Sequence, residues 1–124
     1  MSESTLSAVP AFDAAALVRM AIDVNDRAFT SVFATRYRQM LAGRVNRITS
    51  ALLKADVDAA LDATLSLKVS SVTVGTCELA DLALDIEDNV RRFDVTAART
   101  VASRLPVAAA RADHALAEYL GLSA

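Results

Sequence analysis

The sequence has few of the residues that cross-link, bend or interrupt a chain. Its 124 residues include one cysteine, three glycines, two prolines and no tryptophan, and aromatic residues make up 5%. The single cysteine, Cys77, excludes an internal disulfide, and the scarcity of aromatic residues disfavours β-sheet. Abundant alanine favours closely packed helices instead. We therefore expect an all-α protein.

The sequence also has no long uncharged run and no block of like charge. No apolar stretch approaches the roughly 18 residues that a membrane-spanning helix needs. The 13 Lys and Arg residues are scattered among 15 Asp and Glu residues, for a formal net charge of -2. This distribution argues against binding to nucleic acid or to a membrane. Because a basic-then-apolar secretion signal is absent, we expect a cytoplasmic protein.

The length and composition indicate one domain. With 54% apolar residues, 124 residues suffice for a single compact core. Residues 1–11 contain serine, threonine and Pro10 without a sustained period, so we expect a flexible lead-in. Residues 12–124 are expected to form one helical bundle domain.

Capping residues and apolar spacing predict the helices. Asp13 is expected to cap a short first helix, and the strongest helical spacing in the chain runs on from Asp26. The expected buried positions are Leu17, Met20, Ala21 and Val24 in the first helix and Phe29, Phe33, Tyr37, Met40, Leu41, Val45, Ile48 and Leu52 in the second.

The remaining helices follow from similar signals. Asp56 is expected to cap a third helix that ends at Gly75, and Thr76 to cap a fourth. Asp94 starts a last helical region, in which Pro106 predicts a kink or a split. Together these segments predict an antiparallel four-helix bundle with a short N-terminal helix.

The third helix has two apolar sides. A helical wheel places Ala60, Thr64, Leu67, Ser71 and Val74 on the side expected to face the core. A second stripe contains Leu61, Leu65, Val69 and Val72, with Lys68 at its edge. Three interpretations are open: this helix is buried all round, the wheel is rotated from the true orientation, or the second stripe is an exposed binding or dimer surface.

The stretch Leu65–Gly75, "LSLKVSSVTVG", carries a family resemblance. From about residue 29 to residue 87 the sequence resembles the histidine-containing phosphotransfer (HPt) domain, whose pattern is His-x-Leu-Lys-Gly-Ser followed by a later glycine. Leu67, Lys68, Ser70 and Gly75 match that pattern. The resemblance implies an HPt-like four-helix bundle that acts in a two-component phosphorelay.

Two positions depart from the family pattern. Leu65 stands where the family has its phosphate-accepting histidine, and Val69 stands where it has glycine. Leucine has no nucleophile, so the resemblance extends to the fold and the docking surface but not to phosphate transfer. It implies a pseudo-phosphotransfer module, not an enzyme, that uses Leu61, Leu65, Lys68, Val69 and Val72 to bind a receiver or histidine kinase domain.

Two alternatives remain open. The stripe of Leu61, Leu65, Val69 and Val72 could join two copies of the chain in a homodimer. Phosphotransfer could instead persist through another residue such as His114, the only histidine. We expect neither a cofactor nor a metal, because a lone histidine lacks the paired Glu-x-x-His pattern of metal centres in helical bundles.

Four other side chains carry reactive groups. Ser66, Ser70 and Ser71 have no histidine base close in sequence, and Cys77 lies near a helix N-terminus. We expect these residues to pack rather than to react. Arg36, Arg44 and Arg47 are expected to form a solvated strip on the long helix, with binding to an acidic partner as the alternative.

Overall fold

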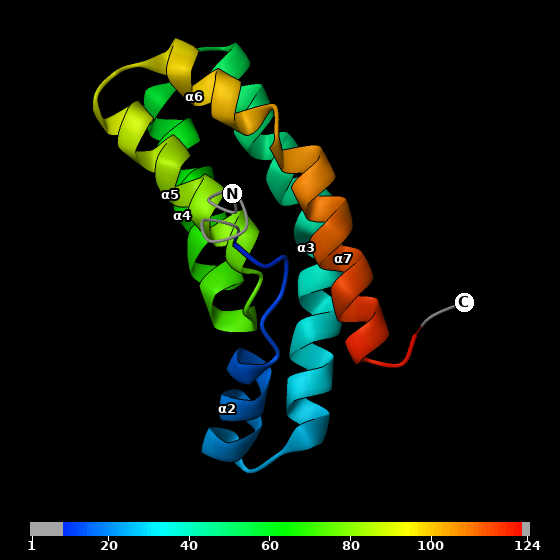
Figure 1. Ribbon diagram of the computed structural model, residues 1–124. Coiled ribbons are helices and arrows are strands. Elements are labelled where there is room, and N and C mark those ends of the chain that lie inside the picture. The colour runs from blue at the N-terminus through cyan, green and yellow to red at the C-terminus, as the bar shows by residue number, and fades with distance from the viewer. Residues whose placement is uncertain (1–8, 123–124) are drawn as a thin grey trace, which may run out of the picture.

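The computed structural model describes residues 9–122, and in that range every regular element is an α-helix (Figure 1). Expectations for residues 1–8 and 123–124 lie outside the described residues. The helices are α2 (Ala15–Val24), α3 (Arg27–Leu53), α4 (Val57–Val74), α5 (Cys77–Arg91), α6 (Val95–Ala102) and α7 (Leu105–Tyr119). The all-α prediction is confirmed, and α3, α4, α5 and α7 pack side by side in a helical bundle.

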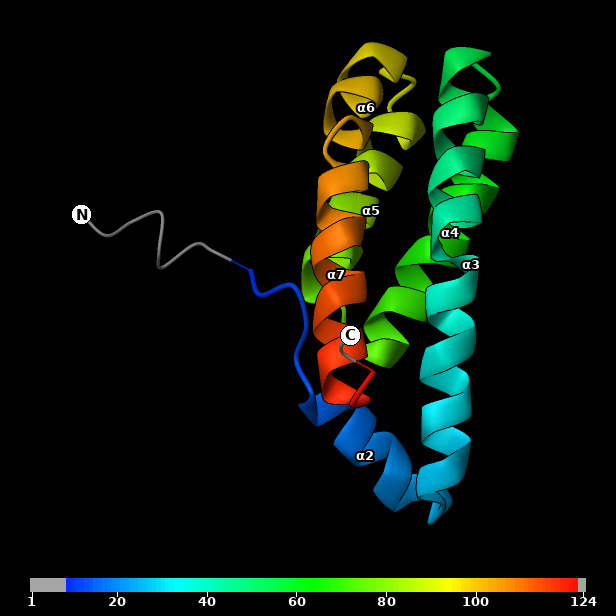
Figure 2. The same cartoon turned by 90° about the vertical axis from the view of Figure 1, so that its right-hand side faces the viewer.

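Aspartate caps set the starts of three helices, and the sequence predicted those at Asp56 and Asp94. At α2 the capping position is held by Ala14 instead of the predicted Asp13, whose carboxylate accepts a hydrogen bond from the backbone N–H of Ala15 at 3.0 Å. The carboxylates of Asp26, Asp56 and Asp94 accept hydrogen bonds from backbone N–H groups three residues later, at 3.0 to 3.1 Å. Each bond satisfies a donor that a helix start leaves without a partner. The short link after α3 then sends α4 back along α3 (Figure 2).

The turn between α4 and α5 is closed by the segment before α2. Gly75 ends α4 with a φ of 97°, which glycine adopts without strain. Its carbonyl accepts a hydrogen bond from the backbone N–H of Asp13 at 2.8 Å, and the carbonyl of Pro10 accepts one from Glu78 at 3.0 Å. The described end of the expected lead-in is therefore anchored to the bundle.

Replacing Gly75 with alanine should destabilise the protein by about 2 kcal/mol or more. A Cβ there would lie 2.4 Å from the carbonyl oxygen of Asp13 and 2.9 Å from the Cβ of Ala16, at a left-handed φ. Gly43→Ala is the matched control, because its Cβ would meet nothing within 4 Å. Urea unfolding of both variants tests this, and an equal stability of the two would contradict it.

The last helical region is split where proline predicted. α6 ends at Ala102 and α7 begins at Leu105, with Pro106 in its first turn, where a missing N–H costs nothing. α6 lies across the end of α3, and the guanidinium of Arg99 donates to the carbonyl of Leu52 at 2.9 Å. α7 then packs along α3 and α5.

The core lies between these helices. Three residues that the sequence predicted to be buried are exposed instead. Phe29 and Met40 are 49% and 44% exposed, and Val24 is 45% exposed. Val24 and Phe29 belong to α2 and to the first turn of α3, where fewer helices pack around the chain (Figure 1). Met40 lies at the middle of α3 and is exposed next to the buried Leu41. The later predicted positions of α3, from Leu41 to Leu52, are buried as expected.

Thr76 departs from its predicted capping role. It occupies the position before α5, but its hydroxyl makes no cap hydrogen bond and is fully buried. Instead it lies 2.7 Å from the hydroxyl of Tyr37, which lies 2.8 Å from the hydroxyl of Ser71. This buried network joins α3, α4 and the start of α5.

Among the described residues, no helix is long and apolar enough to cross a membrane.

Candidate functional site

The inner side of α4 belongs to the core. The five residues that the helical wheel placed there are all buried, with exposures of 0 to 1%: Ala60, Thr64, Leu67, Ser71 and Val74. The helical wheel therefore identified the core-facing side of α4 correctly.

The outer side of α4 faces solvent over its second half. Val69 and Val72 are 61% and 63% exposed, so α4 is not buried all round. Leu65 is half-buried and is not part of the core cluster, whereas Leu61 is half-buried against it. The stripe of Leu61, Leu65, Val69 and Val72 is therefore most accessible towards its C-terminal end.

Leu65 lies in an open groove between α3 and α4. One wall consists of Phe33 and Arg44 from α3. The other wall is formed by α4, with Asp62, Leu65, Ser66, Val69, Ser70 and Thr73. We refer to this surface as the Leu65 groove. Its apolar members, Phe33, Leu65 and Val69, come from both helices, and the other lining side chains are polar or charged.

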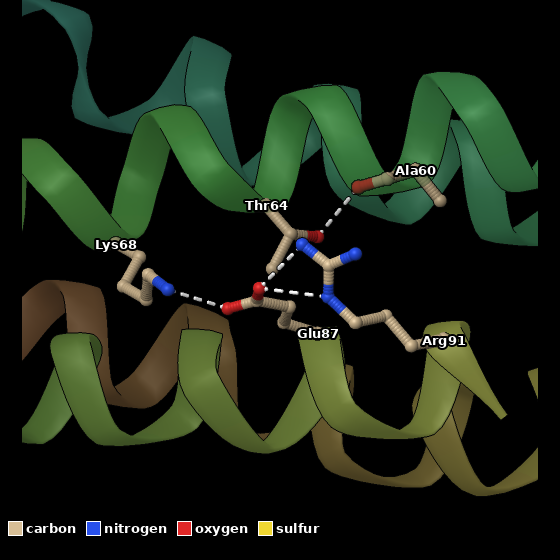
Figure 3. Close-up of polar contacts among 5 residues, drawn as sticks. All are labelled: Ala60, Thr64, Lys68, Glu87 and Arg91. Carbon is tan, nitrogen blue, oxygen red and sulfur yellow. Dashed lines mark hydrogen bonds and ion pairs between the residues drawn. The ribbon is translucent and has the colours of Figure 1, made fainter.

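Lys68 points away from this groove, towards α5. Its ammonium lies 2.6 Å from one carboxylate oxygen of Glu87, and Arg91 donates to the other oxygen at 3.0 Å (Figure 3). Glu87 is only 7% exposed, so the two cations balance a nearly buried charge. The sequence placed Lys68 on the docking surface, but its charged group is engaged within the bundle.

The Lys68–Glu87 contact predicts a pH dependence. The hydrogen bond from Lys68, supported by Arg91 and opposed by burial, lowers the pKa of Glu87 below its ordinary 4.5. A lowered pKa in the folded state stabilises the protein above the unfolded-state pKa, and that contribution disappears as the pH falls through the folded-state value.

Wild type should therefore lose more stability than Glu87→Gln between about pH 5 and about pH 3. Urea unfolding at several pH values measures the difference. Asp23→Asn, which changes an exposed carboxylate on α2, is the control and should follow wild type. A parallel decline in wild type and Glu87→Gln would contradict the prediction.

The hydroxyl groups near Leu65 make hydrogen bonds within the protein. Ser70 donates to the carbonyl of Ser66 at 2.8 Å, and Ser71 is buried in the network with Tyr37 and Thr76. Burial raises the pKa of Tyr37, which keeps its hydroxyl protonated. None of these contacts supplies a base that would activate a serine.

Cys77 and His114 lie outside the Leu65 groove. The thiol of Cys77 donates to the carbonyl of Gly75 at 3.3 Å, and burial raises its pKa, which opposes formation of the reactive thiolate. The side chain of His114 is 75% exposed on α7 and lies 3.6 Å from Glu118. Within residues 9–122, no cluster of three or more His, Cys, Asp and Glu side chains is placed to hold a metal ion.

The structure separates Arg44 from the other two arginines of the predicted strip. Arg36 and Arg47 are exposed, but Arg44 is half-buried in the wall of the Leu65 groove. Its Nε is buried and has no hydrogen-bond partner in the described part of the chain. Nothing in the sequence distinguishes Arg44 from Arg36 and Arg47, because its burial depends on how α3 and α4 pack.

Comparison with known proteins finds no family model, curated protein or solved structure that matches this chain. The basis for a functional proposal is therefore the motif that begins at Leu65 and the Leu65 groove around it.

Proposed function

We propose that the protein is an HPt-like interaction module that binds a receiver or histidine kinase domain of a phosphorelay and does not carry phosphate itself. The observation that supports this best is the position of Leu65. It occupies the acceptor position of the motif, and it lies in an open groove outside the core rather than among the buried residues.

The arrangement of the helices is compatible with this proposal. We propose that α3, α4, α5 and the α6–α7 unit correspond to the antiparallel four-helix bundle of HPt domains, with α2 as the short N-terminal helix. α3 and α4 pack together, as do α4 and α5, and α7 packs on α3 and α5. The motif then lies on the second helix of the bundle.

In the proposed function, Leu65 contributes apolar contact surface where a histidine would accept phosphate. A histidine on the surface of a bundle offers a ring nitrogen to an incoming phosphoryl group, whereas leucine offers only aliphatic carbon. Leu65 and Val69 enlarge the apolar surface instead. Covering the exposed parts of Val69 and Val72 would contribute about 1 kcal/mol each to binding.

Incubation with a receiver domain carrying radioactive phosphate on its aspartate tests the proposal. The protein should bind the receiver domain, measured by calorimetry, and should acquire no acid-labile phosphate. Transfer of phosphate to the chain would contradict the proposal, and its loss in His114→Ala would assign the transfer to His114. Failure of every receiver and kinase domain to bind would also contradict it.

A homodimer is a second candidate function, favoured by the exposure of Val69 and Val72. An apolar stripe in a two-fold interface would be buried in both copies. Analytical ultracentrifugation of wild type and Leu65→Asp distinguishes a homodimer from a monomer that binds another protein. A wild-type dimer that Leu65→Asp dissociates would favour self-association, and monomers in both cases would exclude it.

A further inference from the structure

The Leu65 groove combines an apolar strip with one cation. Arg44 contributes its guanidinium from α3, beside Leu65 and Val69 of α4. Three other arginines of the described residues pair with carboxylates: Arg38 donates to Asp113 at 2.8 Å, Arg111 donates to Glu78 at 3.1 Å, and Arg91 donates to Glu87 at 3.0 Å. Arg44 has no such carboxylate partner within residues 9–122.

The contacts of Arg44 leave its hydrogen-bonding capacity unused. Its only side-chain hydrogen bond in the described residues runs from one terminal nitrogen to the sulfur of Met40, at 3.8 Å, and sulfur is a weak acceptor. Its Nε is buried without a partner. A guanidinium that is partly desolvated in this way gains more from a carboxylate than one that is fully hydrated.

Asp62 lines the same groove without forming a direct ion pair with Arg44. It is exposed on α4, and no ion pair joins the two side chains within the 4.0 Å limit for such a contact. The groove therefore offers a cation beside aliphatic carbon, with an acidic residue nearby that would oppose an incoming anion.

We infer that Arg44 is a specificity-determining residue of the docking surface, and that the Leu65 groove takes a segment of a partner protein that presents a carboxylate next to an apolar side chain. The carboxylate binds the guanidinium of Arg44, and the apolar side chain packs on Leu65 and Val69. This inference rests on the proposed function for the partner's identity, but the chemistry of the groove can be tested without any partner.

The first test uses nuclear magnetic resonance of the Arg44 Nε–H group, with the acetyl-Leu-Asp-amide dipeptide as probe. At millimolar concentrations the dipeptide should shift that signal and the amide signals of Leu65 and Val69. Acetyl-Leu-Asn-amide, which has the same shape without the charge, should shift the Arg44 signal several-fold less. Equal responses to the two dipeptides, or an equal response to sodium sulfate, would overturn the inference.

The second test uses a receiver domain that binds the wild-type protein. Arg44→Gln should weaken binding about tenfold, the usual scale for losing a hydrogen bond to a charged group. Arg36→Gln, which changes an exposed arginine of the same helix, should change it less than about twofold. Asp62→Asn should strengthen binding, because it removes the opposing charge.

The two tests separate this inference from the proposed function. If a receiver domain binds and Arg44→Gln behaves like Arg36→Gln, the inference is wrong and the proposed function stands. If no receiver or kinase domain binds, the proposed function is wrong, and the dipeptide titration still decides whether the groove recognises a carboxylate. Circular dichroism of each variant verifies that the helices are intact.

Discussion

The Leu65→His variant is expected to accept phosphate from a phosphorylated receiver domain, whereas the wild-type protein accepts none. The substitution places an imidazole at the half-exposed position in the Leu65 groove where the HPt motif has its histidine. A neutral ring nitrogen can then form a bond to phosphorus as the bond to the receiver's aspartate breaks. Radioactive phosphate should appear on the protein in an acid-labile, alkali-stable form.

Val72→His is the matched control for that experiment. Val72 is 63% exposed on the same helix, so a histidine there is at least as accessible but does not occupy the acceptor position. Labelling of Leu65→His without labelling of Val72→His would support the motif assignment. Equal labelling of Leu65→His and Val72→His would contradict the motif assignment. So would the absence of labelling from both Leu65→His and the double variant Leu65→His/Val69→Gly, which also restores the family glycine.

Leu67→Ala should destabilise the protein by about 3 to 4 kcal/mol, whereas Leu65→Ala should cost about 1 kcal/mol or less. Leu67 is fully buried between helices, and removing its side chain leaves a cavity. Leu65 lies outside the core cluster at the open groove, where solvent and neighbouring side chains can fill the space. The two substitutions are chemically identical and only two residues apart.

Urea unfolding gives the two free energies of unfolding directly. A large difference would establish in solution that α4 has one core face and one outer face. Similar losses for both variants would mean that Leu65 also supports the core, and the apolar docking surface would then lose its central residue.

The sequence predicted those parts of the fold that depend on neighbouring residues. Caps at Asp56 and Asp94 form as expected, because a cap needs only a carboxylate and the next turn of helix. Gly75 and Pro106 also act where they were expected to, since backbone conformation is a local property. For the same reason the wheel of α4 identified its core face correctly.

Features that depend on how helices pack were missed. Apolar spacing cannot tell that Phe29 lies beyond the reach of most other helices, so it was predicted to be buried. The engagement of Lys68 by Glu87 and the buried hydroxyl of Thr76 each require a partner 19 or 39 residues away. Arg44 looked like Arg36 in sequence, and only the packing of α3 against α4 distinguishes them.

Calorimetry of a receiver or kinase domain binding to Val69→Asp is the decisive measurement of whether a partner docks on the outer face of α4. Val69 is 61% exposed beside Leu65, and Val107, 59% exposed on α7, provides Val107→Asp as a matched control. We expect Val69→Asp to weaken binding of the partner domain by tenfold or more. Val107→Asp should leave binding unchanged, and both variants should stay folded. Equal binding by both variants would show that the partner does not dock on the outer face of α4.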